Sequence, residues 1–207
     1  MLEIKNKIEI ENSSKMLNLD FHPFPEISTE KLFLKQIKAV DFNDFFRLRS
    51  DKNIMKYIPR PLAKDISDVE ILVEKIDAGI KNNERINWGI YLNTTGKLIG
   101  SIGYVNIYPD NLRAEIGYLL DTAFHGKGLM KEAIVAVINF GFDTMKLHSI
   151  EAVVQHMNIA SAKLLEKNNF VKEAHFKEYV YHNGKYSDAV VYSLINPREE
   201  KKWFTNK

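Results

Sequence analysis

A carboxylate and a glycine-spaced lysine lie close together in the middle of the sequence. Glu115 falls in an apolar stretch typical of a strand, and Gly126, Lys127 and Gly128 stand directly before a long apolar stretch typical of a helix. The first N–H groups of a helix lack partners within it, and glycines let a ligand approach the main chain. The pattern therefore predicts an anion site at the start of this helix, with an acidic side chain on the preceding strand.

Two common phosphate-binding motifs do not fit this loop. The sequence has no GxxxxGK[ST] motif, and only Gly126 and Gly128 match the three glycines of GxGxxG, far from the N-terminus. A metal site is not expected either, because His148 and His156 flank a strand without a third ligand at metal spacing. The loop must therefore belong to a different anion-binding fold.

The composition predicts one globular domain with two short extensions. The chain has 207 residues, 45% of them hydrophobic, and its net charge of +2 is spread evenly, which gives no footprint for nucleic acid. It contains no cysteine, no signal-peptide core and no apolar run near the roughly 20 residues of a membrane helix, so we expect a cytoplasmic protein without membrane contact. We expect an N-terminal arm over residues 1–27, an α/β domain over residues 28–196 and a charged tail over residues 197–207.

The elements around the loop alternate between strands and helices. A capping box at Ser67 and Glu70 predicts the start of one helix, and apolar spacing predicts another over residues 128–145. Strands are expected at Thr29–Ile37, Ile86–Leu92, Leu98–Ile107, Arg113–Asp121, His148–Gln155, Phe170–His182 and Tyr186–Ile195. The strands before and after the helix over residues 128–145 should be parallel, whereas tight turns such as Asn183-Gly184 predict antiparallel hairpins. We therefore expect a mixed, mostly antiparallel central sheet with flanking helices.

The strand that carries Glu115 has an informative alternation. Glu115 shares a face with Gly117 and Leu119, and the apolar residues between them share the other face. Because Gly117 has no side chain, the pattern predicts space for a substrate beside the carboxylate. A bulge at this glycine would shift the alternation.

Several short motifs follow one another in a fixed order along the chain. They are Thr29–Leu34 (TEKLFL), Trp88–Ile90 (WGI), Leu98–Gly103 (LIGSIG), Ala114–Tyr118 (AEIGY), His125–Met130 (HGKGLM), Asn158 with Ser161, Asn168–Phe170 (NNF) and Asn183–Tyr186 (NGKY). Together they resemble the GCN5-related N-acetyltransferases, and more narrowly the Rim-type ribosomal-protein N-terminal acetyltransferases. The resemblance covers residues 29–195 and implies the fold of that family, in which one parallel pair of strands splays apart.

The resemblance implies acetyl-CoA as the donor of an acetyl group, with no metal. Its pyrophosphate would lie on the N–H groups of the loop, and its pantetheine amides would pair with the strand backbone before the loop. The strand His148–Gln155 would diverge, and Asn158 would bind the cofactor where the sheet opens. The residues implied for cofactor binding are Tyr118, Leu119, Leu120, His125, Gly126, Lys127, Gly128, Leu129, Met130 and Asn158.

Three positions in these motifs depart from the family pattern. The superfamily loop is usually (Gln/Arg)-x-x-Gly-x-(Gly/Ala), and here His125 stands in the first place and Met130 in the last. Binding through main-chain N–H groups tolerates such changes. Asn168 stands where the branch usually has a glycine before phenylalanine, and asparagine tolerates a left-handed helix cap.

The implied reaction needs a base for the amine and an acid for the departing thiolate. An α-amine has a pKa of about 8 and a lysine side chain about 10.4, so one carboxylate acting through water suffices for an α-amine. Glu115 is the candidate base, with a structural ion pair to Arg113 or a neighbouring lysine as the alternative. Many superfamily members place a tyrosine acid seven residues after the asparagine, but Leu165 occupies that position. Ser161, on the same helix face as Asn158, is the candidate acid, although both residue types also act as local partners of the backbone at helix starts.

We therefore expect an acetyl-CoA-dependent N-acetyltransferase acting on a protein N-terminal α-amine. Two alternatives stay open: an acetyltransferase for a small amine (a polyamine, an aminoglycoside or an amino acid), and a non-catalytic acyl-CoA-binding protein. A polycationic acceptor predicts a strongly acidic cleft, for which Glu173, Glu178 and Asp188 offer only modest material. A homodimer is expected only because dimers are the commonest oligomers.

Overall fold

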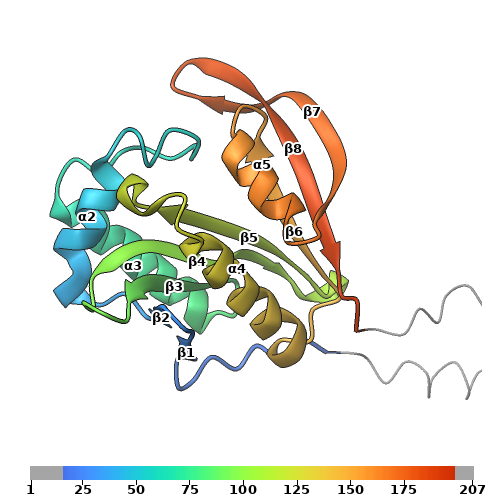
Figure 1. Ribbon diagram of the computed structural model, residues 1–207, viewed down its shortest axis with the longest axis horizontal. Coiled ribbons are helices and arrows are strands. Elements are labelled where there is room, and N and C mark those ends of the chain that lie inside the picture. Colours follow the sequence, from blue (N-terminus) through green and yellow to red (C-terminus); the bar gives the residue numbers. More distant parts are fainter. Residues whose placement is uncertain (1–15, 199–207) are drawn as a thin grey trace, which may run out of the picture.

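Eight strands form one sheet with helices on both of its faces (Figure 1). The computed structural model describes residues 16–198, so most of the expected N-terminal arm and of the expected charged tail lies outside the described residues, and the domain boundaries stay a prediction. The strands are β1 (Ile27–Ser28), β2 (Leu32–Lys35), β3 (Ile86–Leu92), β4 (Leu98–Tyr108), β5 (Arg113–Leu120), β6 (Ser149–Gln155), β7 (Val171–His182) and β8 (Lys185–Ile195). The helices are α2 (Phe42–Ser50), α3 (Ile66–Lys81), α4 (Leu129–Asn139), which continues into a π-helical turn (Phe140–Thr144), and α5 (Ile159–Glu166).

The strand order confirms the expected fold class. Along the sheet the strands follow the order β1-β2-β3-β4-β5-β6-β8-β7. Within residues 16–198 the neighbours β5 and β6 are parallel and the other neighbouring pairs are antiparallel. Because α4 connects β5 to β6, this parallel pair is the strand–helix–strand unit that the sequence predicts.

The strands β5 and β6 separate after a short paired stretch. The pairing joins Arg113–Glu115 of β5 to Ser149–Glu151 of β6. Both strands then continue without pairing to each other, β5 to Leu120 and β6 to Gln155. We call the opening between these two unpaired stretches the fork. The splayed parallel pair that the family resemblance implies is therefore present.

The two faces of β5 pack against different helices, which fixes the strand between two layers. Leu119 joins a buried cluster with side chains of α2 and α3, such as Val73. Leu120, on the opposite face, joins the cluster that contains Leu129 of α4. Burying a side chain of this size contributes about 2 kcal/mol. By alternation, Glu115 lies on the same face as Leu119.

Two helix ends differ from the prediction. The N-cap of α3 is Asp65, whose carboxylate accepts a hydrogen bond from the N–H of Asp68. Ser67 lies inside the first turn, where its hydroxyl donates to Asp65 at 2.6 Å. After α5 the left-handed residue is Asn169 (φ 65°) rather than Asn168, whose side-chain amide donates to a main-chain carbonyl of α5. In both places a second suitable polar residue lies within two positions of the expected one, and the backbone conformation decides which of the two occupies the capping position.

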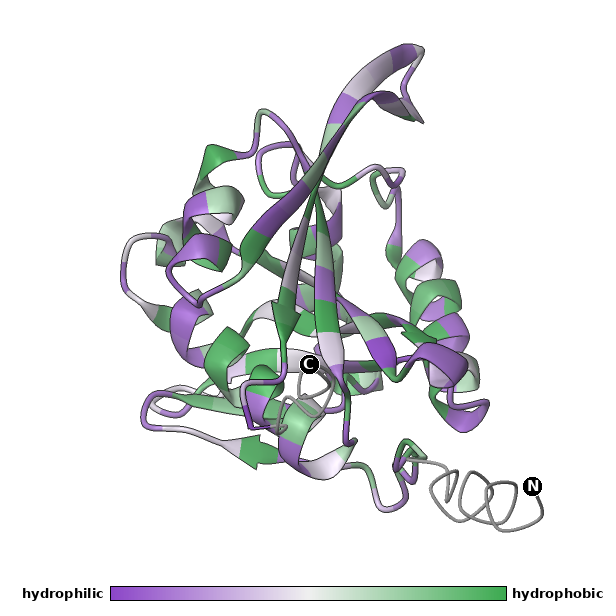
Figure 2. Cartoon of the chain, turned by 90° about the vertical axis from the view of Figure 1, so that its right-hand side faces the viewer, coloured by the Kyte–Doolittle hydropathy of each residue, from purple (hydrophilic) through white to green (hydrophobic). Residues whose placement is uncertain are grey.

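The hairpin of β7 and β8 projects beyond the rest of the molecule (Figure 2). Its turn is Asn183-Gly184, and both residues have positive φ, as this turn type requires. The outer strand β7 is largely exposed, and its pairing with β8 is interrupted between Phe176 and Val180. The outer strand β7 is therefore mostly exposed, whereas β8 pairs with β6 and contributes Val190 and Tyr192 to the core.

Residues 16–198 contain neither a metal-binding group nor a helix that is long and apolar enough to cross a membrane. His156 stacks on His175 with ring centroids 4.7 Å apart, and the Nε2 of His175 lies 2.8 Å from Asp188. These polar side chains thus bind one another within the hairpin region.

Candidate active site

The glycine loop before α4 presents main-chain N–H groups at the start of the helix. Gly126 and Gly128 have φ values of 74° and 77°, a left-handed conformation that glycine adopts at low cost. A Cβ at either position would meet nothing within 4 Å, so the backbone conformation explains these glycines better than crowding does. No side chain of the described residues caps the N-terminus of α4 at Gly128. The loop and the helix dipole together therefore form an anion-binding end.

The side chain of His125 is engaged with the end of β5. Its Nε2 lies 3.0 Å from the carbonyl oxygen of Leu120, so Nε2 must carry the hydrogen and donate it. Next to it, the ammonium of Lys127 lies 5.1 Å from the ring centre of Phe124. The imidazole thus holds the loop against the end of β5. An arginine at this position could instead contact a bound anion directly.

Side chains from both sides meet across the fork. The hydroxyl of Tyr118 on β5 lies 2.7 Å from the Oγ of Ser161 on α5. Asn158 caps α5, because its Oδ1 accepts a hydrogen bond from the N–H of Ser161 at 3.2 Å. Burial raises the pKa of Tyr118 to about 12, although the hydrogen bond with Ser161 lowers it in part. Tyr118 therefore keeps its proton at neutral pH and can act as a hydrogen-bond donor.

Glu115 lies beside a second carboxylate at the last paired position before the fork. It is the register partner of Glu151, and in a parallel pair such partners share one face. The side-chain amide of Asn106 donates to Glu115 at 2.6 Å. Arg113 pairs with Glu151 at 3.4 Å, so the alternative of an Arg113–Glu115 ion pair is not the observed arrangement. The pKa of Glu151 is raised, first by burial and also by Glu115, against the opposing effect of Arg113.

The space expected above Gly117 is occupied. A Cβ at Gly117 would lie 2.9 Å from a methyl carbon of Val105, so this side chain covers the glycine. The irregularity is in β4, where the register with β5 shifts between Tyr104 and Asn106. The bulge therefore leaves the alternation of β5 intact and places Val105 over Gly117. The prediction of open space beside Glu115 at this glycine was wrong.

Three of these partners were missed by sequence reasoning. The pairing of Glu151 with Glu115 depends on the register of β5 and β6, which no local pattern reveals. Asn106 reaches Glu115 because of the bulge in β4. The hydroxyl of Tyr118 had a sequence signal, since alternation places it on the face opposite Glu115, towards α4 and α5.

Comparison with known families identifies the chain. Residues 31–171 match the family model described as an acetyltransferase (GNAT) domain. The chain belongs to the GNAT acetyltransferases. It is thus an acetyl-CoA-dependent N-acyltransferase, which confirms the enzyme class that the sequence predicts and favours it over a non-catalytic acyl-CoA-binding protein.

Some relatives of this GNAT acetyltransferase are named after an acceptor, and the acceptors differ. The uncharacterized N-acetyltransferase YoaA of Bacillus subtilis is 34% identical over 176 residues, which cover 85% of this chain and 99% of that protein. The spermidine N(1)-acetyltransferase of Vibrio cholerae is 25% identical over 159 residues, covering 77% of this chain and 90% of that protein. The crystal structure of the ribosomal-protein-S5-alanine acetyltransferase from Vibrio fischeri has 26% identity and a TM-score of 0.75, covering 84% of this chain and 98% of that one. The expected likeness to ribosomal-protein acetyltransferases is confirmed.

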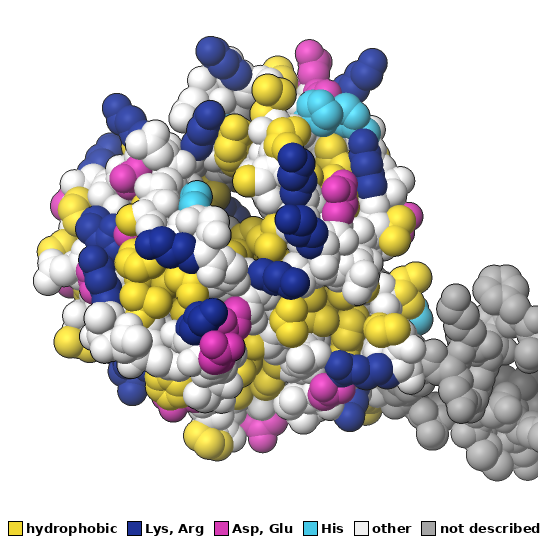
Figure 3. All heavy atoms as spheres, viewed as in Figure 1, with side chains coloured by type: hydrophobic (Ala, Val, Ile, Leu, Met, Phe, Trp, Pro, Cys, Tyr) yellow, Lys and Arg dark blue, Asp and Glu magenta, His cyan; other side chains and the backbone are white. Residues whose placement is uncertain are grey.

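The surface of this GNAT acetyltransferase is hollowed between α4 and α5, where Lys and Arg side chains gather (Figure 3). Four lysines belong to these two helices or directly adjoin them. Lys127 precedes α4 and Lys131 lies in its first turn, whereas Lys163 lies in α5 and Lys167 directly follows it. Positive charge around a concave site attracts anionic ligands.

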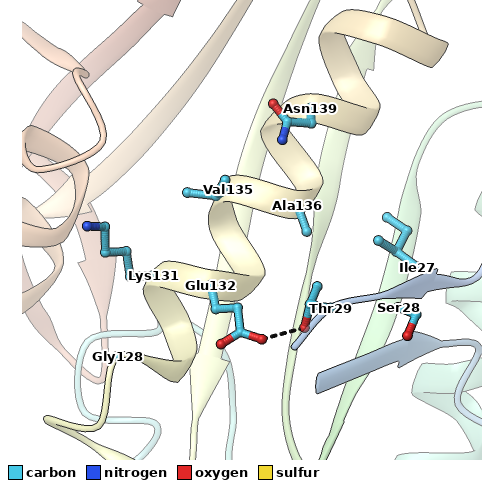
Figure 4. Close-up of a pocket in the computed structure, with 9 residues that line it drawn as sticks. All are labelled: Ile27, Ser28, Thr29, Gly128, Lys131, Glu132, Val135, Ala136 and Asn139. Carbon is cyan, nitrogen blue, oxygen red and sulfur yellow. Dashed lines mark hydrogen bonds between the residues drawn. The ribbon is translucent and has the colours of Figure 1, made fainter. Parts of the chain in front are cut away.

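A second hollow of about 510 Å³ lies along the outer side of α4, away from the fork (Figure 4). Glu132 points towards β1 and β2, where its Oε1 accepts hydrogen bonds from the hydroxyl of Thr29 at 2.6 Å and the N–H of Lys31 at 2.7 Å. Val135 and Ala136 form much of its apolar lining. Because Glu132 joins the helix to the sheet edge, its polar contacts support the fold.

Proposed function

We propose that this GNAT acetyltransferase acetylates a polypeptide N-terminal α-amine, with Glu115 as the base and Ser161 as the acid. The observation that carries the proposal is the arrangement of the fork. Glu115 lies at its closed end on one face of the sheet, and the Tyr118–Ser161 pair reaches across from the other. Likeness to the Vibrio fischeri ribosomal-protein acetyltransferase supports the choice of acceptor.

The loop and the fork fit the two parts of acetyl-CoA. The uncapped N–H groups of Gly126–Met130 suit its pyrophosphate, and surrounding lysines add positive charge. The unpaired edge of Tyr118–Leu120 suits its pantetheine amides, because an open strand edge offers donors and acceptors. Asn158, which stands at the start of α5 beside the fork, is assigned a cofactor contact in addition to its cap.

The proposed reaction joins the acceptor nitrogen to the acetyl carbon and breaks the carbon–sulfur bond. Glu115 first accepts a proton from the acceptor ammonium, directly or through one water. The neutral amine then attacks the thioester. As the carbon–sulfur bond breaks, Ser161 gives its hydroxyl proton to the departing thiolate and takes up a proton from the Tyr118 hydroxyl across their 2.7 Å contact. The acceptor nitrogen releases its second proton to water, and Tyr118 regains a proton from solvent, so the products are the acetylated amide and a neutral thiol. Ser161, with Tyr118 as its proton partner, thus takes the place of the tyrosine acid that many family members have where Leu165 stands.

An α-amine suits this apparatus better than a lysine side chain. Its pKa of about 8 lies more than two units below that of a lysine, about 10.4, so a single carboxylate can deprotonate it more easily. A small amine is the second candidate. The spermidine acetyltransferase relative favours it, as does the adjacent pair Glu115 and Glu151, which attracts a cation. A homodimer and a cytoplasmic location stay predictions.

A thiol-release assay distinguishes these acceptors. We expect turnover with peptides that carry a free N-terminal amine, and none with the same peptides after N-terminal acetylation. Preferential turnover of spermidine would contradict the proposed acceptor while keeping the enzyme class. Hydrolysis of acetyl-CoA alone, without any acetylated amine, would contradict the proposed reaction.

A further inference from the structure

Arg113 pairs with Glu151 beside the candidate base. Its Nη1 lies 3.4 Å from the Oε2 of Glu151, and its guanidinium carbon lies 4.7 Å from the ring centre of Tyr108. Arg113 and Glu115 are two residues apart on β5 and therefore share a face, on which Glu151 lies as the register partner of Glu115. The guanidinium thus contacts an aromatic ring of β4 and a carboxylate of β6 on the face that carries Glu115.

The two carboxylates of this face have different partners. Glu115 accepts a hydrogen bond from the neutral side-chain amide of Asn106 at 2.6 Å, and within residues 16–198 it forms no ion pair. Glu151 has the cation, and its side chain is only 16% exposed, against 39% for Arg113. A carboxylate that is mostly buried is costly unless a positive charge accompanies it. The charge of Arg113 therefore serves Glu151, and Glu115 is left to attract the acceptor.

The acceptor must approach Glu115 across the strands rather than along β5. Val105 covers Gly117, so an acceptor cannot lie over that glycine. Glu115 is half-buried and Asn106 is exposed, so the carboxylate is open to solvent on the sheet face where β4, β5 and β6 meet. Neighbouring strands are about 4.8 Å apart. A basic side chain on the residue that carries the amine therefore reaches Glu151 and Arg113 when the amine is at Glu115.

The three charged side chains leave one net negative charge at the closed end of the fork. One ammonium group neutralises it, whereas a second positive charge would lie against the guanidinium of Arg113 and be repelled. The next carboxylate of the row is Glu173, which accepts a hydrogen bond from Ser193, the register partner of Glu151, at 2.6 Å. Glu173 is exposed and two strand spacings from Glu151, about 10 Å, so solvent and salt screen most of its effect.

We propose that Arg113 is a specificity-determining residue. By neutralising Glu151, it makes the site select acceptors with a single positive charge at the reacting end, which are polypeptides whose first side chain is not basic. The inference rests on the proposed function, since it places the α-amine at Glu115. Spermidine, which carries several positive charges along a short chain, is disfavoured for the same reason.

The test removes the two charges of the ion pair singly and together. Two peptides that differ only in their first residue, arginine or glutamine, are compared in the thiol-release assay, because a guanidinium adds a permanent charge but no second amine to acetylate. In Arg113→Gln the arginine-to-glutamine ratio of kcat/KM should rise about 10-fold over wild type, mainly through KM, as expected for one charged contact. In Glu151→Gln the ratio should fall below wild type, because the guanidinium is left without its carboxylate. The double variant again has one net negative charge and should recover the wild-type ratio.

The assay is run at pH 8, because burial raises the pKa of Glu151 and the loss of Arg113 removes an effect that lowers it. Lys97→Gln, an exposed change directly before β4, also removes one positive charge and should keep the wild-type ratio.

The direction of each change separates charge from a structural role. An unchanged ratio in Arg113→Gln, or a shift of the same sign in both single variants that grows in the double variant, would overturn the inference while the proposed function stands. If Arg113→Gln does not fold, Glu151→Gln still decides, since a ratio at or above the wild-type value there would also overturn the inference. Failure of the wild-type enzyme to acetylate either peptide would overturn the proposed function, and the inference with it.

Discussion

The hydroxyl of Tyr118 lies 2.7 Å from the Oγ of Ser161, and this contact joins β5 to α5 across the fork. It links the strand that carries Glu115 to the helix that carries Asn158. A buried phenol that keeps its proton and a small hydroxyl make a short path for a proton. The contact thus offers a physical replacement for the tyrosine that is absent at Leu165.

Removing either hydroxyl of this pair should slow the reaction more than it weakens binding. We expect Ser161→Ala and Tyr118→Phe each to lower kcat by about 10²-fold, the lower end of general acid catalysis, with little change in KM for acetyl-CoA. The double variant should be no slower than the worse single variant, because both hydroxyls serve one proton path. Steady-state kinetics of the three variants measure this.

The pH profile provides the control for that pair. Because burial raises the pKa of Tyr118 to about 12, the wild-type rate should not fall between pH 7 and 9 through loss of this proton. Multiplicative losses in the double variant would show that the two hydroxyls act separately, which contradicts the relay.

Replacing Glu115 by glutamine should remove the base while keeping the side-chain shape. We expect kcat/KM to fall by about 10²-fold at pH 7. The loss should shrink as the pH approaches 9, because an α-amine with a pKa of about 8 then loses its proton to solvent. Glu70→Gln, an exposed change on α3, is the matched control and should behave as wild type. Full activity of Glu115→Gln from pH 6 to 9 would exclude Glu115 as the base.

The chain offers a matched pair of glycines for testing the loop. Gly128 and Gly96 both have positive φ, 77° and 66°, and neither has a neighbour within 4 Å of a Cβ position. Alanine at either site should cost about 1 kcal/mol of unfolding free energy through backbone strain alone. Only Gly128→Ala should weaken CoA binding, measured by calorimetry. Equal affinities in the two variants would remove the loop from the binding site.

The ion pair between Arg47 and Asp121 should make stability depend on pH. Burial alone would raise the pKa of Asp121, but the Ala123 N–H and the Arg47 guanidinium outweigh it, and the pKa lies below its ordinary value of 3.8. The stabilisation is therefore present above about pH 4 and is lost as the pH falls through the lowered pKa. Asp121→Asn should cost about 2 kcal/mol at pH 7, since it removes a charge-assisted hydrogen bond from a nearly buried carboxylate.

Denaturant unfolding at several pH values measures that effect. The gap between wild type and Asp121→Asn should be full at pH 6 to 7 and should narrow below pH 4. Asp110→Asn, in the exposed turn between β4 and β5, is the control with no expected gap. A gap that persists at pH 2.5 would mean that packing, rather than charge, accounts for the loss.

Much of the fold follows from the sequence because its signals are local. Alternation located β5, turn residues located the β7–β8 hairpin, and apolar spacing located α4. The loop conformation was also predictable, since Gly126 and Gly128 adopt the positive φ values that a glycine pattern suggests. The cap of α3 was misplaced because Asp65 and Ser67 both suit an N-cap, and only the extended backbone at Asp65 distinguishes them.

The partners within the candidate site were less predictable because they depend on distant segments. Whether Glu115 meets Glu151 depends on the register of β5 and β6, two strands that α4 separates along the chain. Val105 covers Gly117 because one residue is inserted in β4 relative to β5. Neither feature has a sequence signal, so the side chains that surround Glu115 could be identified only from the structure.

The fork gives the sheet an unfinished edge in its interior. From Ile116 to Leu120 one side of β5 has its partner in β4, and among residues 16–198 no strand pairs with the other side. An extended ligand with amide groups would complete the sheet here as an additional strand. Amide hydrogen exchange along this stretch should therefore report occupancy directly, with slower exchange on ligand binding even in variants that no longer carry out the reaction.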